Sequence, residues 1–330
     1  MRAPTWLRWL DPLTAMILLV LVVALLVPVP DAVGVVLDGV RTGAIVLLFL
    51  LYGARMPTSE VVDGLRRFRL QGSMLAATYV LFPLLGLAVQ LLPDAVLDPD
   101  LRRGLLYLSV LPSTVQSSVV MTSIARGNVA GAITGATISN VLGVVMTPLL
   151  VAVLLGATGA GLDGGAVGGI LLQLLLPFVV GQCLQPWVGA WLRRHGALTR
   201  VTDRTTILLV VFTSVSEAQA TGAWDSLTVG ALVLLLVVCA VMLAVVLGVT
   251  WRAGALLGLD RPDRVALLMC GSKKSAATGL PMAAVLFAPA LAASVALPVI
   301  AFHQLQIVVT AVLARRLART PPGDGVGAAA

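Results

Sequence analysis

Charged side chains are scarce in this 330-residue chain, where Asp, Glu, Lys and Arg make up only 11% of the residues. A soluble globular domain carries roughly 25%. Here 59% of the residues are apolar and the mean hydropathy is +1.02. Long apolar stretches recur from Leu13 to Leu317. The composition therefore excludes a sizeable soluble domain and indicates an integral membrane protein.

Residues that build metal sites and disulfides are also scarce, with two histidines and three cysteines. Cys183, Cys239 and Cys270 lie in apolar stretches without paired spacing, so the sequence predicts neither a disulfide framework nor a zinc site. His195 and His303 are far apart in sequence and supply no metal set. We find no nucleophile elbow and no phosphate-binding glycine loop. We therefore expect no enzyme activity, no cofactor and no nucleic-acid partner.

Apolar segments long enough for a transmembrane helix, roughly 20 residues, occur ten times. They are predicted at 13–29, 34–53, 71–92, 101–121, 127–155, 165–192, 205–222, 226–250, 264–288 and 291–316. With ten spans, 17 arginines fall on one side and only Arg41, Arg102 and Arg103 on the other, as the positive-inside rule requires. We expect an all-α, multi-pass protein of the plasma (inner) membrane, with both termini cytoplasmic and a disordered cytoplasmic tail at 319–330.

Two halves of opposite orientation follow from a glycine-rich joint at roughly 156–169, which separates five spans from five. The chain is then a single transmembrane domain, 1–330, with inverted repeats at roughly 13–155 and 165–316. The equivalent fourth and ninth helices are interrupted by polar residues, Gly and Pro, in LPSTVQSS at 111–118 and CGSKKSAATGLP at 270–281. Broken backbone at membrane depth survives only where protein or a water-filled cavity satisfies it. Paired breaks of this kind indicate a transporter's binding site.

Lysine is nearly absent, because 20 of the 22 basic residues are arginine. The two lysines, Lys273 and Lys274, are adjacent in the second break. An intramembrane charge costs about 2.5 kcal/mol or more, which makes such residues functional candidates. Carbonyls at the C-terminal end of a broken helix are partly negative and coordinate sodium in many transporters. We expect one lysine to replace a bound cation and the other to face the substrate cavity; the alternative is a structural role.

Three stretches resemble the bile acid:sodium symporter family, and more narrowly its sodium/bile acid symporter-like branch. They are LPSTVQSSVVMTSIARGNVAGAITGATISNVLG at 111–143, QLLLPFVVGQCLQPW at 173–187 and CGSKKSAATGLPMAAVLF at 270–287. The resemblance implies ten helices in two inverted five-helix repeats. Helices 3–5 and 8–10 would form a core domain, and helices 1, 2, 6 and 7 a panel domain. The broken helices 4 and 9 would cross at their unwound centres.

The resemblance also implies ligands for sodium in the fourth and fifth helices. By position, Ser117 and Ser118 match a polar pair that serves one sodium site. Two ligands of the fifth helix fall on Ala132 and Ala136 in this sequence. Nearby hydroxyls are offset in register, at Thr134, Thr137 and Ser139.

In the ninth helix the family's sodium-binding stretch Glu-Val-Gly-Met-Gln-Asn-Ser aligns with 269–275. The acidic ligand becomes Met269, and the Gln-Asn pair becomes Lys273 and Lys274. Losing a carboxylate and gaining two ammonium groups makes two bound sodium ions electrostatically implausible. Coupling to sodium or to protons therefore stays open. His303 is either a proton-handling group near neutral pH or a partner in an interhelical hydrogen bond.

These observations favour a secondary transporter of a small organic anion, such as a bile-acid-like carboxylate or sulfonate, by alternating access. The lipid bilayer is the expected environment, and the oligomeric state is open. A different class, a non-transporting membrane sensor or regulator with the same fold, is the alternative; its lysines would lock one conformation. The candidate substrate and ion site comprises Ser113, Thr114, Gln116, Ser117, Ser118, Thr134, Thr137, Ser272, Lys273, Lys274, Ser275, His303 and Gln304.

Overall fold

The computed structural model describes residues 12–27, 29–55, 67–156, 164–220 and 228–319, and these ranges are helical without any strand. The helices are α1 (Pro12–Leu26), α2 (Asp31–Arg55), α4 (Phe68–Ala76), α5 (Phe82–Gln90), α6 (Pro99–Val110), α7 (Gln116–Ile124), α8 (Val129–Leu150), α9 (Gly164–Arg194), α10 (Gly196–Ala220), α11 (Val229–Leu256), α12 (Arg261–Gly271), α13 (Ala276–Leu286) and α14 (Pro289–Arg319). Two π-helical turns, η3 (Ala77–Leu81) and η4 (Val151–Leu155), continue α4 and α8.

Six of the described helical stretches are long and apolar enough to cross a membrane. They are Val33–Arg55, Phe68–Gln90, Val129–Leu155, Leu172–Arg194, Val229–Leu256 and Leu291–Arg319. The predicted spans 101–121 and 264–288 are each occupied by two short helices, α6 with α7 and α12 with α13. The chain is an all-helical, multi-pass membrane protein. Of the predicted tail at 319–330, only Arg319 lies within the described residues.

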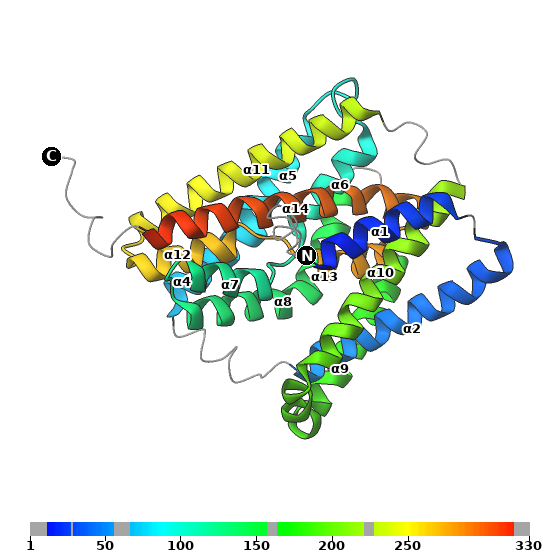
Figure 1. The fold of residues 1–330 in the computed structure, drawn as a ribbon, viewed down its shortest axis with the longest axis horizontal. Helices are drawn as coiled ribbons and strands as arrows, with labels where there is room; N and C mark the ends of the chain where they lie inside the picture. Colours follow the sequence, from blue (N-terminus) through cyan, green and yellow to red (C-terminus); the bar gives the residue numbers. More distant parts are fainter. Residues whose placement is uncertain (1–11, 28, 56–66, 157–163, 221–227, 320–330) are drawn as a thin grey trace, which may run out of the picture.

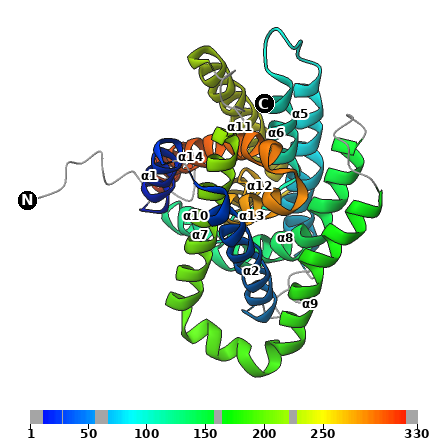
Figure 2. The ribbon, with the colours of Figure 1, turned by 90° about the vertical axis from the view of Figure 1, so that its right-hand side faces the viewer.

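One group of helices comprises α1, α2, α9 and α10 (Figures 1 and 2). The α2 and α9 helices pack along each other so closely that a Cβ on Gly53 would overlap the carbonyl oxygen of Phe178. Gln182 fixes the pair because its Nε2 donates to the carbonyl of Gly53 at 2.7 Å. The α10 helix packs against α1 and α2, and an ion pair of 3.2 Å joins Arg55 to Asp203.

A second group, α4 to α8 and α11 to α14, surrounds the two breaks predicted from sequence. In Figure 1, α4, α7 and α12 lie on the side away from α2 and α9. Asn128 ties α8 to α12, because its Oδ1 accepts from the backbone N–H of Gly131 at 2.9 Å and its Nδ2 donates to Asp263 at 2.6 Å. These contacts hold α12 in place beside α8, just before the second break.

Candidate functional site

The first break separates α6 from α7 and spans residues 111–115. Pro112 has no backbone N–H, and the carbonyl of Leu108 accepts from the N–H of Leu111 at 3.2 Å instead. The N–H of Ser113 donates to Ser139 Oγ at 3.0 Å, which leaves the carbonyl of Ser109 without its usual helical donor. Leu111 itself is extended, with φ −70° and ψ 152°. The end of α6 therefore presents free carbonyl oxygens inside the protein.

The second break separates α12 from α13 at residues 272–275 and lies against the first. The N–H of Ser275 donates to the carbonyl of Pro112 at 2.8 Å. In the other direction, Ser113 Oγ donates to the carbonyl of Cys270 at 2.6 Å, and Ser118 Oγ to that of Met269 at 3.3 Å. Each break thus supplies the hydrogen-bond partners that the other has lost, as buried backbone requires.

Lys274 occupies the end of α6 and is only 1% exposed. Its Nζ donates to the carbonyl oxygens of Thr78, Ser109 and Leu111 at 2.8, 2.7 and 2.7 Å. An ammonium group has three donors and no acceptor, so the three carbonyls satisfy it fully. The ring of Phe82 adds a cation–π contact, with its centroid 4.2 Å from Nζ.

The carbonyl of Thr78 is available to Lys274 because of the π-helical turn η3. In a regular α-helix that carbonyl would accept from the N–H of Phe82. Phe82 instead donates to the carbonyl of Ala77, five residues back. The next possible donor is Pro83, which has no N–H. The π turn and the proline together leave one carbonyl of this helix for the lysine.

Lys273 points the other way, into the first turn of α7. Its side chain is completely buried, and Nζ donates to the carbonyl of Ser117 at 2.8 Å. The α7 helix begins without a side-chain cap, and its N-terminal amides carry partial positive charge in the same turn that contains Ser117. Within the described residues neither lysine forms an ion pair with a carboxylate.

Gln306 braces the second break from α14 and is completely buried. The backbone N–H of Lys274 donates to its Oε1, and its Nε2 donates to the carbonyl of Lys274, both at 2.8 Å. The same Nε2 lies 3.0 Å from Nδ1 of His303. The sequence prediction placed His303 and Gln304 at the site. The hydrogen bonds to the backbone of Lys274 are made by Gln306 instead.

The residues predicted for the site separate into those that join the network and those that do not. Ser113, Thr114, Ser117, Ser118, Lys273, Lys274 and Ser275 are linked by hydrogen bonds in and between the breaks, and His303 joins through Gln306. Ser272 Oγ donates within α12, to the carbonyl of Leu268. Gln116 is exposed and Gln304 half-buried. In α8 the described links to the breaks run through Ser139 and Asn140 rather than Thr134 and Thr137.

The oxygen atoms expected to bind sodium have protein partners. Thr114 Oγ1 lies 2.6 Å from Ser117 Oγ and 3.1 Å from Ser118 Oγ. The carbonyl of Ser117 accepts from an ammonium group, and position 269 carries a methionine in place of a carboxylate. This donor set does not fit a sodium ion, because the ammonium groups of Lys273 and Lys274 already bind carbonyl oxygens of the crossing.

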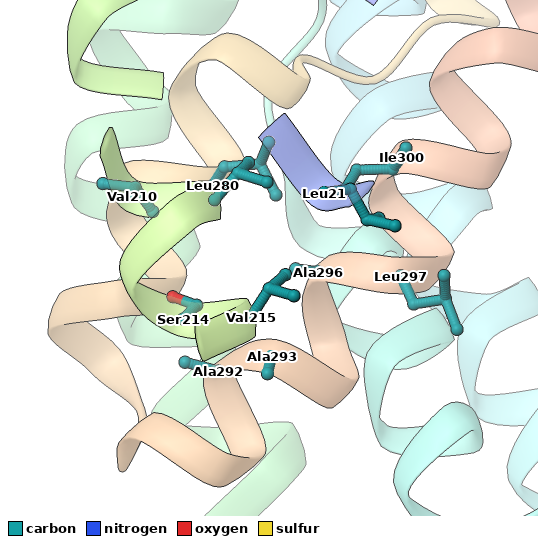
Figure 3. Close-up of a pocket in the computed structure, with 11 residues that line it drawn as sticks. Leu21, Val210, Ser214, Val215, Leu280, Ala292, Ala293, Ala296, Leu297 and Ile300 are labelled. Carbon is teal, nitrogen blue, oxygen red and sulfur yellow. The ribbon is translucent and has the colours of Figure 1, made fainter. Parts of the chain in front are cut away.

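A small apolar pocket lies where the two groups of helices meet (Figure 3). Leu21 comes from α1, Val210 and Ser214 from α10, Leu280 from α13, and Ala296 and Ile300 from α14. Ser214 is the polar side chain among the labelled residues. The pocket therefore borders α13, the helix that begins at the second break.

Comparison with known proteins gives matches over nearly the whole chain. The sequence profile of the SBF-like CPA transporter family matches residues 11–319. A Pseudomonas aeruginosa protein named "Uncharacterized protein PA2026" is 44% identical over 94% of this chain and 93% of its own length. "Putative symporter YfeH" of Escherichia coli is 41% identical over 94% of both chains. "Sodium/bile acid cotransporter 7" of Rattus norvegicus is 25% identical over 82% of this chain and 80% of its own.

Proposed function

This chain belongs to the SBF-like CPA transporter family, and we propose that it is a secondary transporter that moves a small organic anion across the membrane by alternating access. The relatives whose names state a function are named as a symporter and a cotransporter, and not as enzymes. A small-molecule substrate and a bilayer environment follow from this membership. The observation that carries the proposal is the crossing of two broken helices around two buried lysines.

The proposed architecture has ten transmembrane helices in two inverted five-helix repeats. The breaks at 111–115 and 272–275 support it, because they fall in the fourth helix of each half. The grouping of α1, α2, α9 and α10 supports a panel domain, and the remaining helices a core. The arginine distribution supports cytoplasmic termini in a plasma (inner) membrane.

In this mechanism Lys274 is the permanent cation of the crossing. In a sodium-coupled carrier, carbonyls at helix ends hold the ion. Here the ammonium group of Lys274 takes three such carbonyls and stays with the protein through the cycle. Transport therefore needs no sodium, because the positive charge at these carbonyls belongs to the protein.

Lys273 favours an anionic substrate. Its ammonium group lies at the start of α7, whose N-terminal dipole has the same sign of charge. An anion near Ser117 would relieve this repulsion and bind to an unpaired positive charge. The pocket of Figure 3 would accept an apolar part of the same molecule. A carboxylate or sulfonate attached to an apolar body fits both features.

A sensor without transport activity is the second candidate. Lys274 is fully satisfied and 1% exposed, as expected of a lock that holds one conformation. Single cysteines at Ser118 and Ser275 distinguish the two functions. A transporter exposes them in turn to reagents on both sides of the membrane, and a sensor on one side or neither.

Uptake into proteoliposomes tests the transport proposal, with labelled taurocholate as the probe because rat relatives are named for bile acid cotransport. We expect saturable uptake that empty vesicles lack and that unlabelled organic anions inhibit. Lys273→Gln should abolish it, whereas Lys273→Arg, which keeps the positive charge, should retain a part. Inhibition by organic cations but not by anions would contradict the proposal.

A further inference from the structure

The hydrogen bonds of Gln306 fix the orientation of its amide. A backbone N–H can only donate and a backbone carbonyl can only accept. The N–H of Lys274 therefore requires the amide oxygen of Gln306, and the carbonyl of Lys274 requires its nitrogen, both at 2.8 Å. The second hydrogen on that nitrogen is directed at His303, 3.0 Å away.

It follows that Nδ1 of His303 is an acceptor. The amide nitrogen of Gln306 has no lone pair to offer, so Nδ1 must carry one. The imidazole is then neutral, with its hydrogen on Nε2. Protonation would place an N–H of His303 against the N–H of Gln306, and the two donors would repel each other. The contact between His303 and Gln306 would then be lost.

We propose that His303 is the proton-binding site that couples this transporter to a proton gradient. The inference rests on the proposed transport function and adds its coupling ion. In the neutral state, His303 holds Gln306, and Gln306 holds both backbone groups of Lys274 in the second break. Protonation of Nδ1 releases this brace and allows the break at 272–275 to rearrange. One proton that enters with one monovalent anion gives an electroneutral cycle.

Within the second break, whose backbone Gln306 holds, the charged residues are Lys273 and Lys274. Of the helices that pack against α14, α7 and α13 carry no titratable side chain. The titratable groups of α6, α10 and α11 are Asp100, Arg102, Arg103, Tyr107, Arg200, Asp203, Arg204, Glu217, Cys239 and Arg252. Arg102 and Arg103 pair with Asp94 and Asp100, and Asp203 and Glu217 pair with Arg55 and Arg41.

A proton on His303 and an anion bound at Lys273 have opposite charges, so each should favour the binding of the other. By linkage this effect is reciprocal. Cooperative binding of the two is what a proton-coupled symporter requires.

The chain has only two histidines, which allows a direct spectroscopic test. Protein with isotope-labelled histidine in detergent micelles gives nitrogen NMR signals that report the tautomer of each ring. His195 is the internal control, because its Nδ1 lies 2.9 Å from the carbonyl of Trp191 and must donate. We expect opposite tautomers, with Nδ1 protonated in neutral His195 and bare in neutral His303. His303 should also take up a proton when the pH is lowered.

Uptake measurements with an imposed pH gradient give the functional test. His303→Asn places an amide oxygen near the position of Nδ1, so it keeps the acceptor but cannot take up a proton. It should fold but lose all stimulation of labelled taurocholate uptake by an acidic exterior. His195→Asn is the matched control and should keep that stimulation.

The two readouts separate the possible failures. A hydrogen on Nδ1 of neutral His303, or full pH stimulation in His303→Asn, would overturn the coupling site. The NMR result does not depend on transport. If no anion is taken up by any variant while His303 shows the expected tautomer and titrates, the transport proposal fails and the proton-binding site stands.

Discussion

At the scale of single residues, Lys274 is defined by its three partners, which are all backbone carbonyls. Lys274→Ala removes a group equivalent to propylammonium and leaves three buried acceptors. Each unsatisfied group costs about 1–3 kcal/mol. We expect the variant to lose uptake and to unfold at a lower temperature, and millimolar propylammonium or sodium to restore part of its thermal stability.

Two variants serve as controls for this rescue. Lys274→Met fills the same volume without a charge, so added cations should have no space to bind and no effect. Lys273→Ala exposes a single acceptor, the carbonyl of Ser117, and should be less destabilised. An equal loss of thermal stability in Lys273→Ala and Lys274→Ala, with no response to added cations, would contradict the role of Lys274 as a cation that belongs to the protein.

The sequence identified both lysines, because charge in an apolar segment is visible without a structure. Their partners were not predictable in the same way. Thr78 contributes a backbone carbonyl, which every residue type has, so the sequence gives no sign of this contact. Gln306 lies three residues after His303, yet its pairing with the backbone of Lys274 depends on a contact between residues 32 apart. Of the three hydroxyls noted in the fifth predicted helix, Ser139 makes a link to the first break, and Asn140 makes another.

At the scale of elements, the π-helical turn η3 is tied to Pro83. Pro83→Ala supplies a backbone N–H, which allows the π turn to relax into regular α-helix. The carbonyl of Thr78 would then accept from the N–H of Phe82 and would no longer be free for Lys274. We expect uptake to fall although the intrinsic helix propensity rises. Uptake and thermal unfolding of Pro83→Ala should be compared with those of Pro177→Ala in α9, which lies outside the crossing. Unchanged uptake in Pro83→Ala would show that Thr78 is dispensable.

The contact between α2 and α9 depends on glycine. A Cβ on Gly53 would overlap the carbonyl of Phe178, and one on Gly181 would overlap that of Leu50. We expect Gly53→Ala or Gly181→Ala to separate the helices and lower the unfolding temperature. Gly43→Ala on α2 is the control, because a Cβ there meets no atom within 4 Å and helix propensity should rise. Equal unfolding temperatures for all these variants would contradict the close contact.

Sequence reasoning located the helix interruptions better than the helix contacts. Proline and polar residues marked the two breaks, which the structure places at 111–115 and 272–275. The segment 71–92 was predicted as one helix and contains the π turn. A π turn depends on which carbonyl each N–H reaches, and the apolar pattern of the segment carries no such information.

At the scale of the whole molecule, charge distribution and helix grouping support the same picture. Apart from the two lysines, the basic residues are arginines in or near the segments between predicted spans, where they orient the chain. The α1, α2, α9 and α10 helices form one group and the broken helices lie in the other, with an apolar pocket between them. Alternating access would be a movement of one group against the other, with the ammonium group of Lys274 held by its three carbonyls inside the second.

Sodium dependence of uptake tests the central claim most directly. Labelled taurocholate uptake into proteoliposomes should be measured with an inward sodium gradient and with choline in place of sodium, at equal pH and membrane potential. Because Lys274 already occupies the carbonyls that would hold the ion, we predict equal initial rates in the two conditions. Uptake that requires sodium would show that an ion site exists beside the lysines and would contradict the account.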